Sequence, residues 1–129
     1  MNDKDGTIKV DRMVVAVDCG PVVNPDTVKA QIEGSVIEGL STALKEEIKF
    51  SNGGVKTANF DDYKIIRMSE IPSIEVHIVK SKEIIGGVGE PGVTPTAPAV
   101  ANAFFNATGV RIRRIPMTPK IVMDALKKA

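Results

Sequence analysis

The sequence is poor in the residues that build covalent or metal-linked sites, with one cysteine and one histidine among its 129 residues. A single cysteine cannot close a disulfide within the chain, and Cys19 with His77 cannot complete a short zinc motif. We therefore expect no metal ion held by protein side chains. A reducing cytoplasm is the expected location, because disulfides persist mainly in oxidising compartments.

The sequence also lacks an excess of either charge and any long apolar run. Lys and Arg total 17 against 16 for Asp and Glu, which leaves a net charge of +1. Such a balance gives no long-range field to attract nucleic acid or an anionic membrane. No apolar run approaches the length of a membrane span. We therefore expect neither nucleic acid nor a membrane as a partner.

What is present is the composition of an ordinary globular domain. Apolar residues make up 43% of the chain and charged residues 26%, close to average usage. The length fits one domain that buries its own core. We predict a flexible tail over residues 1–7 and a single domain over residues 8–129. The polar start is typical of a natural lead-in and favours a separate gene product.

The first half of the chain predicts a strand followed by a long helix. The valine-rich stretch 8–18 meets Gly20-Pro21, as a strand that ends in a turn does. Asn24-Pro25-Asp26 supplies a cap and a first turn, and apolar residues then recur every four positions to about Ile48. Gly34 and Gly39 weaken a helix, so we expect a chain segment or a ligand to pack closely there.

The second half predicts four further elements after a turn at 51–54 and one or two weak extended segments over 55–67. Residues 74–79 alternate as a strand, with His77 outward as a solvated residue. A helix is expected from 96–98 to Gly109, a strand over 110–115 with its arginines solvated, and a short helix after Thr118-Pro119. Together these predict an α+β fold, a two-layer sandwich with a mixed sheet and helices on one face.

A glycine-rich stretch, Gly87-Val88-Gly89-Glu90-Pro91-Gly92, matches the G-x-G-x-x-G pattern of dinucleotide-binding loops. The context fails, because Pro91 lacks an amide donor, the next predicted helix begins several residues later, and no ribose-binding acid follows about twenty residues on. Glycines around one carboxylate clear space for a substrate, so Glu90 is a candidate general base. The alternative is an exposed acid in an ordinary surface loop.

Several short motifs resemble one known family in their order along nearly the whole chain. They are Val17-Asp18-Cys19-Gly20, Asn24-Pro25, Gln31-Ile32-Glu33-Gly34, Gly87-Val88-Gly89-Glu90, Pro98-Ala99 with Ala101-Asn102-Ala103, Ala107-Thr108-Gly109 and Pro116. Together they resemble the C-terminal part of the molybdopterin-binding large subunit of molybdenum hydroxylases, the family of xanthine dehydrogenase and aldehyde oxidoreductase. Residues 8–129 would then be a C-terminal molybdopterin-binding-type domain.

The resemblance implies roles for four residues. Glu90 is similar to the family's active-site glutamate, which takes the proton from a molybdenum-bound hydroxide. Val88 and Gly89 would approach the metal's ligand sphere or the pterin through their backbone, and Gln31 would hydrogen-bond the pterin. The metal itself is held by the pterin in this family. Taken without the resemblance, the favoured interpretation of Gln31 is an exposed helix residue, because glutamine is common on helix surfaces.

The resemblance also sets limits on what this chain does alone. The family's large subunit is several times longer, and one cysteine cannot hold an iron–sulfur cluster. The first hypothesis is a fragment or subunit that completes a hydroxylase with the remaining large-subunit chain, iron–sulfur and FAD subunits, and molybdopterin. The pterin type stays open, and the cytosine dinucleotide form is one candidate. The second is an isolated, inactive domain that folds without cofactor and self-associates or binds a partner. The substrate stays open, since the family uses aldehydes, purines, N-heterocycles and carbon monoxide.

Overall fold

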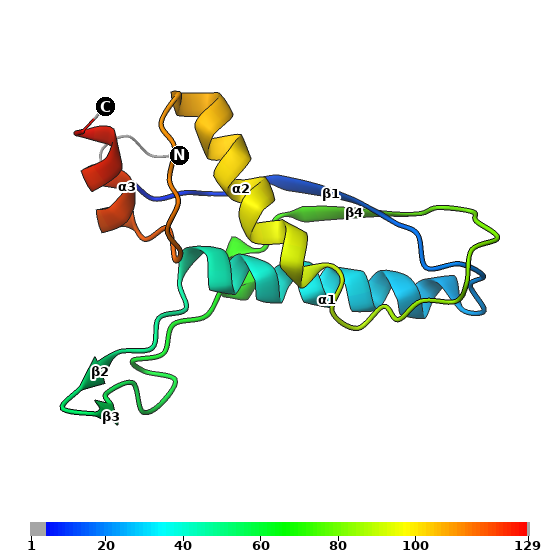
Figure 1. The fold of residues 1–129 in the computed structure, drawn as a ribbon, viewed down its shortest axis with the longest axis horizontal. Helices are drawn as coiled ribbons and strands as arrows, with labels where there is room; N and C mark the ends of the chain where they lie inside the picture. Colours follow the sequence, from blue (N-terminus) through cyan, green and yellow to red (C-terminus); the bar gives the residue numbers. More distant parts are fainter. Residues whose placement is uncertain (1–4, 129) are drawn as a thin grey trace.

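The computed structural model describes residues 5–128, which form strands, helices and one 3₁₀ turn (Figure 1). In chain order they are β1 (Arg12–Val17), α1 (Pro25–Leu44), β2 (Phe50–Ser51), β3 (Gly54–Val55), the 3₁₀ turn η1 (Met68–Glu70), β4 (Ser73–Ile78), α2 (Val93–Thr108) and α3 (Pro119–Leu126). The α+β class is confirmed. Residues 1–4 of the predicted tail lie outside the described residues, and Gly6 is buried where an added Cβ would lie 2.6 Å from the carbonyl oxygen of Pro119.

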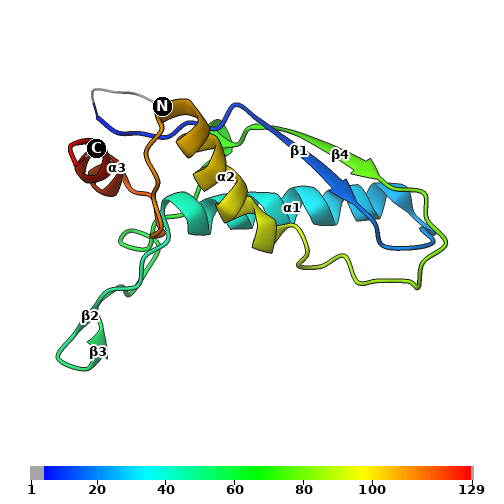
Figure 2. The same ribbon diagram turned by 45° about the horizontal axis from the view of Figure 1, so that its top comes forward.

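The central sheet is the parallel pair of β1 and β4, in a register that runs from Arg12 opposite Ser73 to Val17 opposite Ile78. The predicted alternation of β4 is confirmed, because Ile74, Val76 and Ile78 pack against the core and His77 is exposed. The antiparallel pair β2–β3 is a separate sheet, so parallel and antiparallel pairing both occur but in two sheets, and the prediction of one mixed sheet is wrong. Figure 2 shows α1 along one side of the β1–β4 pair.

Helix α1 begins as predicted and ends earlier. The Asn24 Oδ1 accepts hydrogen bonds from the backbone N–H groups of Asp26 and Thr27, at 3.1 and 3.2 Å. The predicted end near Ile48 is wrong, because the chain leaves the helix at Lys45, where φ is −137°. There the Lys45 ammonium pairs with Glu70, a partner distant in sequence. Ile48 is 49% exposed as a result.

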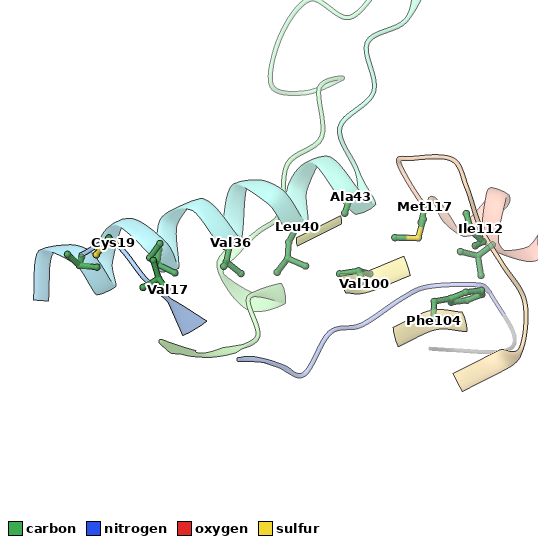
Figure 3. Close-up of a cluster of buried hydrophobic side chains, with 12 residues drawn as sticks. Val17, Cys19, Val36, Leu40, Ala43, Val100, Phe104, Ile112 and Met117 are labelled. Atoms are coloured by element: carbon green, nitrogen blue, oxygen red, sulfur yellow. The ribbon is translucent and has the colours of Figure 1, made fainter. Parts of the chain in front are cut away.

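The core lies between α1, α2 and the sheet (Figure 3). The apolar stripe of α1 supplies Ile32, Val36 and Leu40, each at most 1% exposed. Gly39 brings α2 close, since a Cβ there would lie 2.7 Å from the Thr96 Cβ. The expected close packing is thus confirmed at Gly39, where the packed segment is α2. Nothing lies within 4 Å of a Cβ built on Gly34.

Helix α2 starts at Val93, so the start predicted at 96–98 is wrong. Proline usually marks the first turn, which favoured Pro98 as the opening. The helix instead includes Pro98 in its interior, on a solvent-exposed position. Water can satisfy the carbonyl that loses its partner at such a position. The glycine loop therefore runs directly into α2, which ends as predicted at Gly109 with φ +72°.

Residues 110–115, all within the described range, form no strand, so the predicted strand is wrong. The side chains still alternate, with Ile112 buried and Arg111 and Arg113 exposed. The Arg111 guanidinium lies 3.7 Å from the centroid of the Phe105 ring and donates to the Asn102 Oδ1 at 2.7 Å. Alternation reports which side is buried, but a strand also needs a neighbouring strand to accept its hydrogen bonds. The final helix α3 is confirmed with its Thr118 cap.

Residues 46–66, here named the arm, project away from the body (Figures 1 and 2). The predicted turn at 51–54 is confirmed as the tip of the β2–β3 pair, where Asn52 and Gly53 have φ of 51° and 76°. At its base the Ser41 Oγ accepts a hydrogen bond from the Ile66 N–H at 3.0 Å. The arm is therefore tied to the C-terminal end of α1.

Candidate functional site

The glycine loop, residues 86–92, is held at its first residue by the segment that directly follows β1. The Gly86 N–H donates to the Cys19 carbonyl at 3.0 Å. Gly20, with φ +72°, lies close to the two residues Glu83 and Ile84 shortly before the loop. A Cβ built on Gly20 would be 2.7 Å from each of their carbonyl oxygens. A side chain at Gly20 would displace this approach, so the glycine allows the loop to meet the strand end.

The loop is held at its last residue by α1. A Cβ built on Gly92 would lie 2.1 Å from the Ser35 Oγ and 3.3 Å from the Ile32 carbonyl oxygen. The Thr96 Oγ1 donates to the Gly92 carbonyl at 2.7 Å, which fixes the start of α2 over the same point. In both ribbon views the loop runs along α1 on the side away from β1 and β4 (Figures 1 and 2).

Glu90 lies between these two anchors. Its carbonyl accepts a hydrogen bond from the Val93 N–H at 3.0 Å, which turns the chain into α2. Its side chain is exposed, and within residues 5–128 its carboxylate has no hydrogen-bond or ion-pair partner. The carboxylate is thus free to meet a group from outside this part of the chain.

The other three predicted site residues differ in their exposure. Gln31 is exposed on α1, and its amide has no hydrogen-bond partner among the described residues. Ser35, which contacts Gly92, lies one helical turn further along the same face as Gln31. Val88 is half-buried against the core, and Gly89 is exposed with nothing within 4 Å of a built Cβ. The structure therefore brings the loop's end beside the face of Gln31, without a direct bond between Gln31 and Glu90.

Sequence reasoning missed the residues that hold the loop. Ser35 and Thr96 are both buried, at 4% and 2% exposure, although serine and threonine are usually found on the surface. Their signal in the sequence is weak: Ser35 follows Gln31 by one helical turn, and Thr96 follows Gly92 by one turn. Only the contact between α1 and α2 shows why small side chains stand there.

A cavity of about 780 Å³ lies beside the loop's first anchor. It is lined by the end of β4, the start of α1 and the segment 80–82, with Lys29 and His77 among its polar residues.

No group of three or more His, Cys, Asp or Glu side chains that could hold a metal ion occurs within residues 5–128. None of the helices in this described part is long and apolar enough to cross a membrane.

Comparison with known proteins defines the class of this domain. The sequence profile of the molybdopterin cofactor-binding domain matches residues 1–72, which include β1, α1 with Gln31, and the arm. The chain is 42% identical over 120 residues to the isoquinoline 1-oxidoreductase subunit beta of Brevundimonas diminuta, across 93% of this chain and 15% of that protein. It is 33% identical to the aldehyde oxidoreductase molybdenum-binding subunit of Escherichia coli K12, across 94% of this chain and 18% of that subunit.

Solved structures agree with these relatives. The aldehyde oxidoreductase of Desulfovibrio gigas superposes with a TM-score of 0.84 at 30% identity, across 96% of this chain and 14% of that one. The quinoline 2-oxidoreductase of Pseudomonas putida 86 gives 0.81 at 25% identity, across 93% and 16%. The fold is thus that of a molybdopterin cofactor-binding domain.

The chain belongs to the molybdenum hydroxylase family, as part of the molybdopterin-binding large subunit. It spans between about a tenth and a fifth of the length of the curated relatives it matches. The resemblance noted in the sequence is therefore confirmed.

Proposed function

We propose that this chain supplies part of the active site of a molybdopterin-dependent hydroxylase or aldehyde oxidoreductase, with Glu90 as its general base. The observation that carries the proposal is the position of Glu90, an unpartnered carboxylate in a loop that is anchored at both ends. A general base must come within hydrogen-bond reach of the proton it removes. Two anchors reduce the positions that the loop can adopt, so the carboxylate is held near one place while its oxygens stay accessible.

The other predicted site residues fit the cofactor that the family implies. The Gln31 amide offers both a donor and an acceptor with no protein partner, as a pterin ring edge requires. The open backbone at Gly89 lets a flat group approach without meeting a side chain, and Val88 would contact it through its own backbone. When bound, molybdopterin would supply the redox chemistry. We propose that it is bound in its cytosine dinucleotide form.

Glu90 would act on the proton at one carboxylate oxygen. In its ionised form it would accept a proton from a group bound over the loop, and in its protonated form it would release that proton to water. Gln31 would orient the cofactor from α1 without taking part in proton transfer. The Gly92–Ser35 contact would keep Glu90 and Gln31 in a fixed relation.

On this proposal the domain is incomplete as an enzyme by itself, and its correspondence to a small part of each relative supports that view. The proposed partners are the remainder of the molybdenum-binding large subunit and iron–sulfur and FAD subunits that carry electrons away. A cytoplasmic location belongs to the same proposal, because the single Cys19 suits a reducing compartment. The alternative is an isolated, inactive domain that self-associates, which predicts neither molybdenum nor a large-subunit partner.

The test is the molybdenum and pterin content of the protein purified gently from its own source, with every copurifying chain identified. Near-stoichiometric molybdenum with the rest of a large subunit supports the proposal, and a metal-free self-associated protein supports the alternative. Gln31→Ala should lower the pterin content of the assembly. Glu33→Ala is the matched control, because Glu33 is also exposed but lies about 200° around α1 from Gln31.

A further inference from the structure

The arm exposes large apolar side chains that its own structure does not use. Phe60 is 79% exposed, Phe50 71% and Val55 58%, and around the arm's base Met68 is 86% exposed. Apolar surface of this kind is unfavourable in water, and clustered exposure marks interaction sites. The two phenylalanines are half of the four in the whole chain.

The arm is nevertheless an ordered structure, held by polar contacts. The Asp62 carboxylate accepts from the N–H groups of Ala58 and Asn59, at 3.0 Å to the same oxygen. The Lys49 N–H donates to the Thr57 Oγ1 at 2.9 Å. Hydrogen bonds hold the shape of the arm, and the phenylalanines do not pack together as a core within it. They are presented outward.

Phe60 also lies between two hollows of the surface. One, of about 700 Å³, is lined by Phe60, Tyr63, Ile65 and Met68 together with α1 and α3 residues. The other, of about 280 Å³, is lined by Phe60, Tyr63 and Ile48. An exposed apolar side chain can insert into a partner, and the hollows beside it can accept the partner's side chains. Such shape complementarity is typical of well-packed interfaces.

We propose that the arm is a docking element for the remainder of the molybdenum-binding large subunit, an inference that rests on the proposed function. The relatives match 93–95% of this chain, and a solved relative superposes over 96% of it. The greater part of each relative lies outside the matched region, and it is this part that would cover Phe50 and Phe60.

A second copy of this chain fits the arm less well. A stable protein interface buries roughly 800 Å² on each partner, whereas a phenylalanine buries only about 150–250 Å². Phe50 and Phe60 together would therefore bury no more than about 500 Å², which is less than one partner's share of a stable dimer interface. These two residues suit a large partner that also covers the region at the other end of α1. There Val23, 95% exposed, precedes the helix, and Ile84, 92% exposed, lies beside Gly20.

Site-specific photocrosslinking in the protein's own source tests the docking. The variants Phe60→p-benzoylphenylalanine and Ile84→p-benzoylphenylalanine are irradiated in cells, and mass spectrometry identifies the crosslinked peptides. We expect both positions to crosslink to the remainder of a molybdenum-binding large subunit. A crosslink from position 84 alone would overturn the docking role of the arm and leave the proposed function standing. Crosslinks from neither position would overturn both, and a crosslink from position 60 to a second copy would overturn the choice of partner.

A substitution series measures the strength of the contact. Phe60→Ser should lower copurification of the large-subunit remainder by about tenfold or more, as removal of a central aromatic anchor does. Lys56→Ser is the matched control, because Lys56 is exposed on the same arm and its side chain makes no bond among the described residues. Both variants should keep the thermal unfolding midpoint of the parent, since neither side chain is buried. Undiminished copurification of Phe60→Ser would contradict the proposal.

Discussion

The backbone of Gly92 touches the side chain of Ser35 so closely that no larger residue fits between the glycine loop and α1. A built Cβ on Gly92 would lie 2.1 Å from the Ser35 Oγ and 3.2 Å from its Cβ. This contact joins the loop that carries Glu90 to the helix that carries Gln31. A substitution at Gly92 therefore tests how the loop is held, and a substitution at Glu90 tests the proposed chemistry.

Gly92→Ala should destabilise the domain by about 1–3 kcal/mol, because the added methyl overpacks a filled site. Gly92 has φ −77°, a conformation that alanine adopts freely, so the contact and not the backbone causes the loss. Urea unfolding followed by circular dichroism gives the free energy. Ser35→Ala in the same chain should restore part of it. A Gly92→Ala protein as stable as the parent would show that the loop is not seated on Ser35.

Glu90→Gln should lower the turnover of the assembled enzyme by about 10²- to 10⁴-fold, the usual contribution of a general base. The amide keeps the shape of the side chain but cannot take up the proton. Glu83→Gln is the control, since Glu83 is an exposed glutamate shortly before the same loop. Steady-state kinetics measure both variants. Equal turnover for Glu90→Gln and the parent would remove Glu90 from the chemistry.

Gly39 and Gly34 lie on the same helix and should respond to alanine in opposite directions. At Gly39 a Cβ would lie 2.7 Å from the Thr96 Cβ and 2.9 Å from the Val93 carbonyl oxygen. We expect Gly39→Ala to cost about 1–3 kcal/mol. Nothing lies within 4 Å of a Cβ on Gly34, so Gly34→Ala should gain about 0.5–1 kcal/mol from helix propensity. Thermal unfolding midpoints that shift in the same direction would refute this assignment of the two faces.

The Lys45–Glu70 pair should give part of the stability a dependence on acid pH. A hydrogen bond from the Lys45 ammonium, followed by one from the Arg67 N–H, lowers the pKa of Glu70 in the folded state. A lowered folded-state pKa stabilises the fold above the ordinary glutamate pKa of about 4.3. This stabilisation is lost as the pH falls through the lower folded value.

Glu70→Gln should therefore lower the free energy of unfolding at pH 7 by at most about 1 kcal/mol, because solvent screens a pair that is partly exposed. The difference from the parent should disappear once the pH falls below the lowered folded-state pKa of Glu70. Urea unfolding at pH 7 and in that acid range measures it, and Glu38→Gln serves as the exposed control on α1. A difference that persists unchanged at low pH would exclude the ion pair as its cause.

Much of the fold could be predicted because its signals are local. The Asn24 cap and the four-residue apolar repeat specify α1 from neighbouring residues alone, and Gly109 specifies the end of α2 in the same way. The alternation of residues 74–78 likewise identifies the buried face of β4. Glu90 and Gln31 were selected from motifs, and their roles stay predictions.

The sequence by itself determined the α+β class, the main helices and the family, since these depend on periodicity, caps and motif order. Tertiary structure decided where α1 stops, at Lys45 beside Glu70, and that residues 110–115 have no strand to pair with. It also decided that Ser35 holds the glycine loop and that the arm presents Phe60 to solvent. Each of these depends on contacts between residues far apart in the chain, or on their absence, which local patterns do not record.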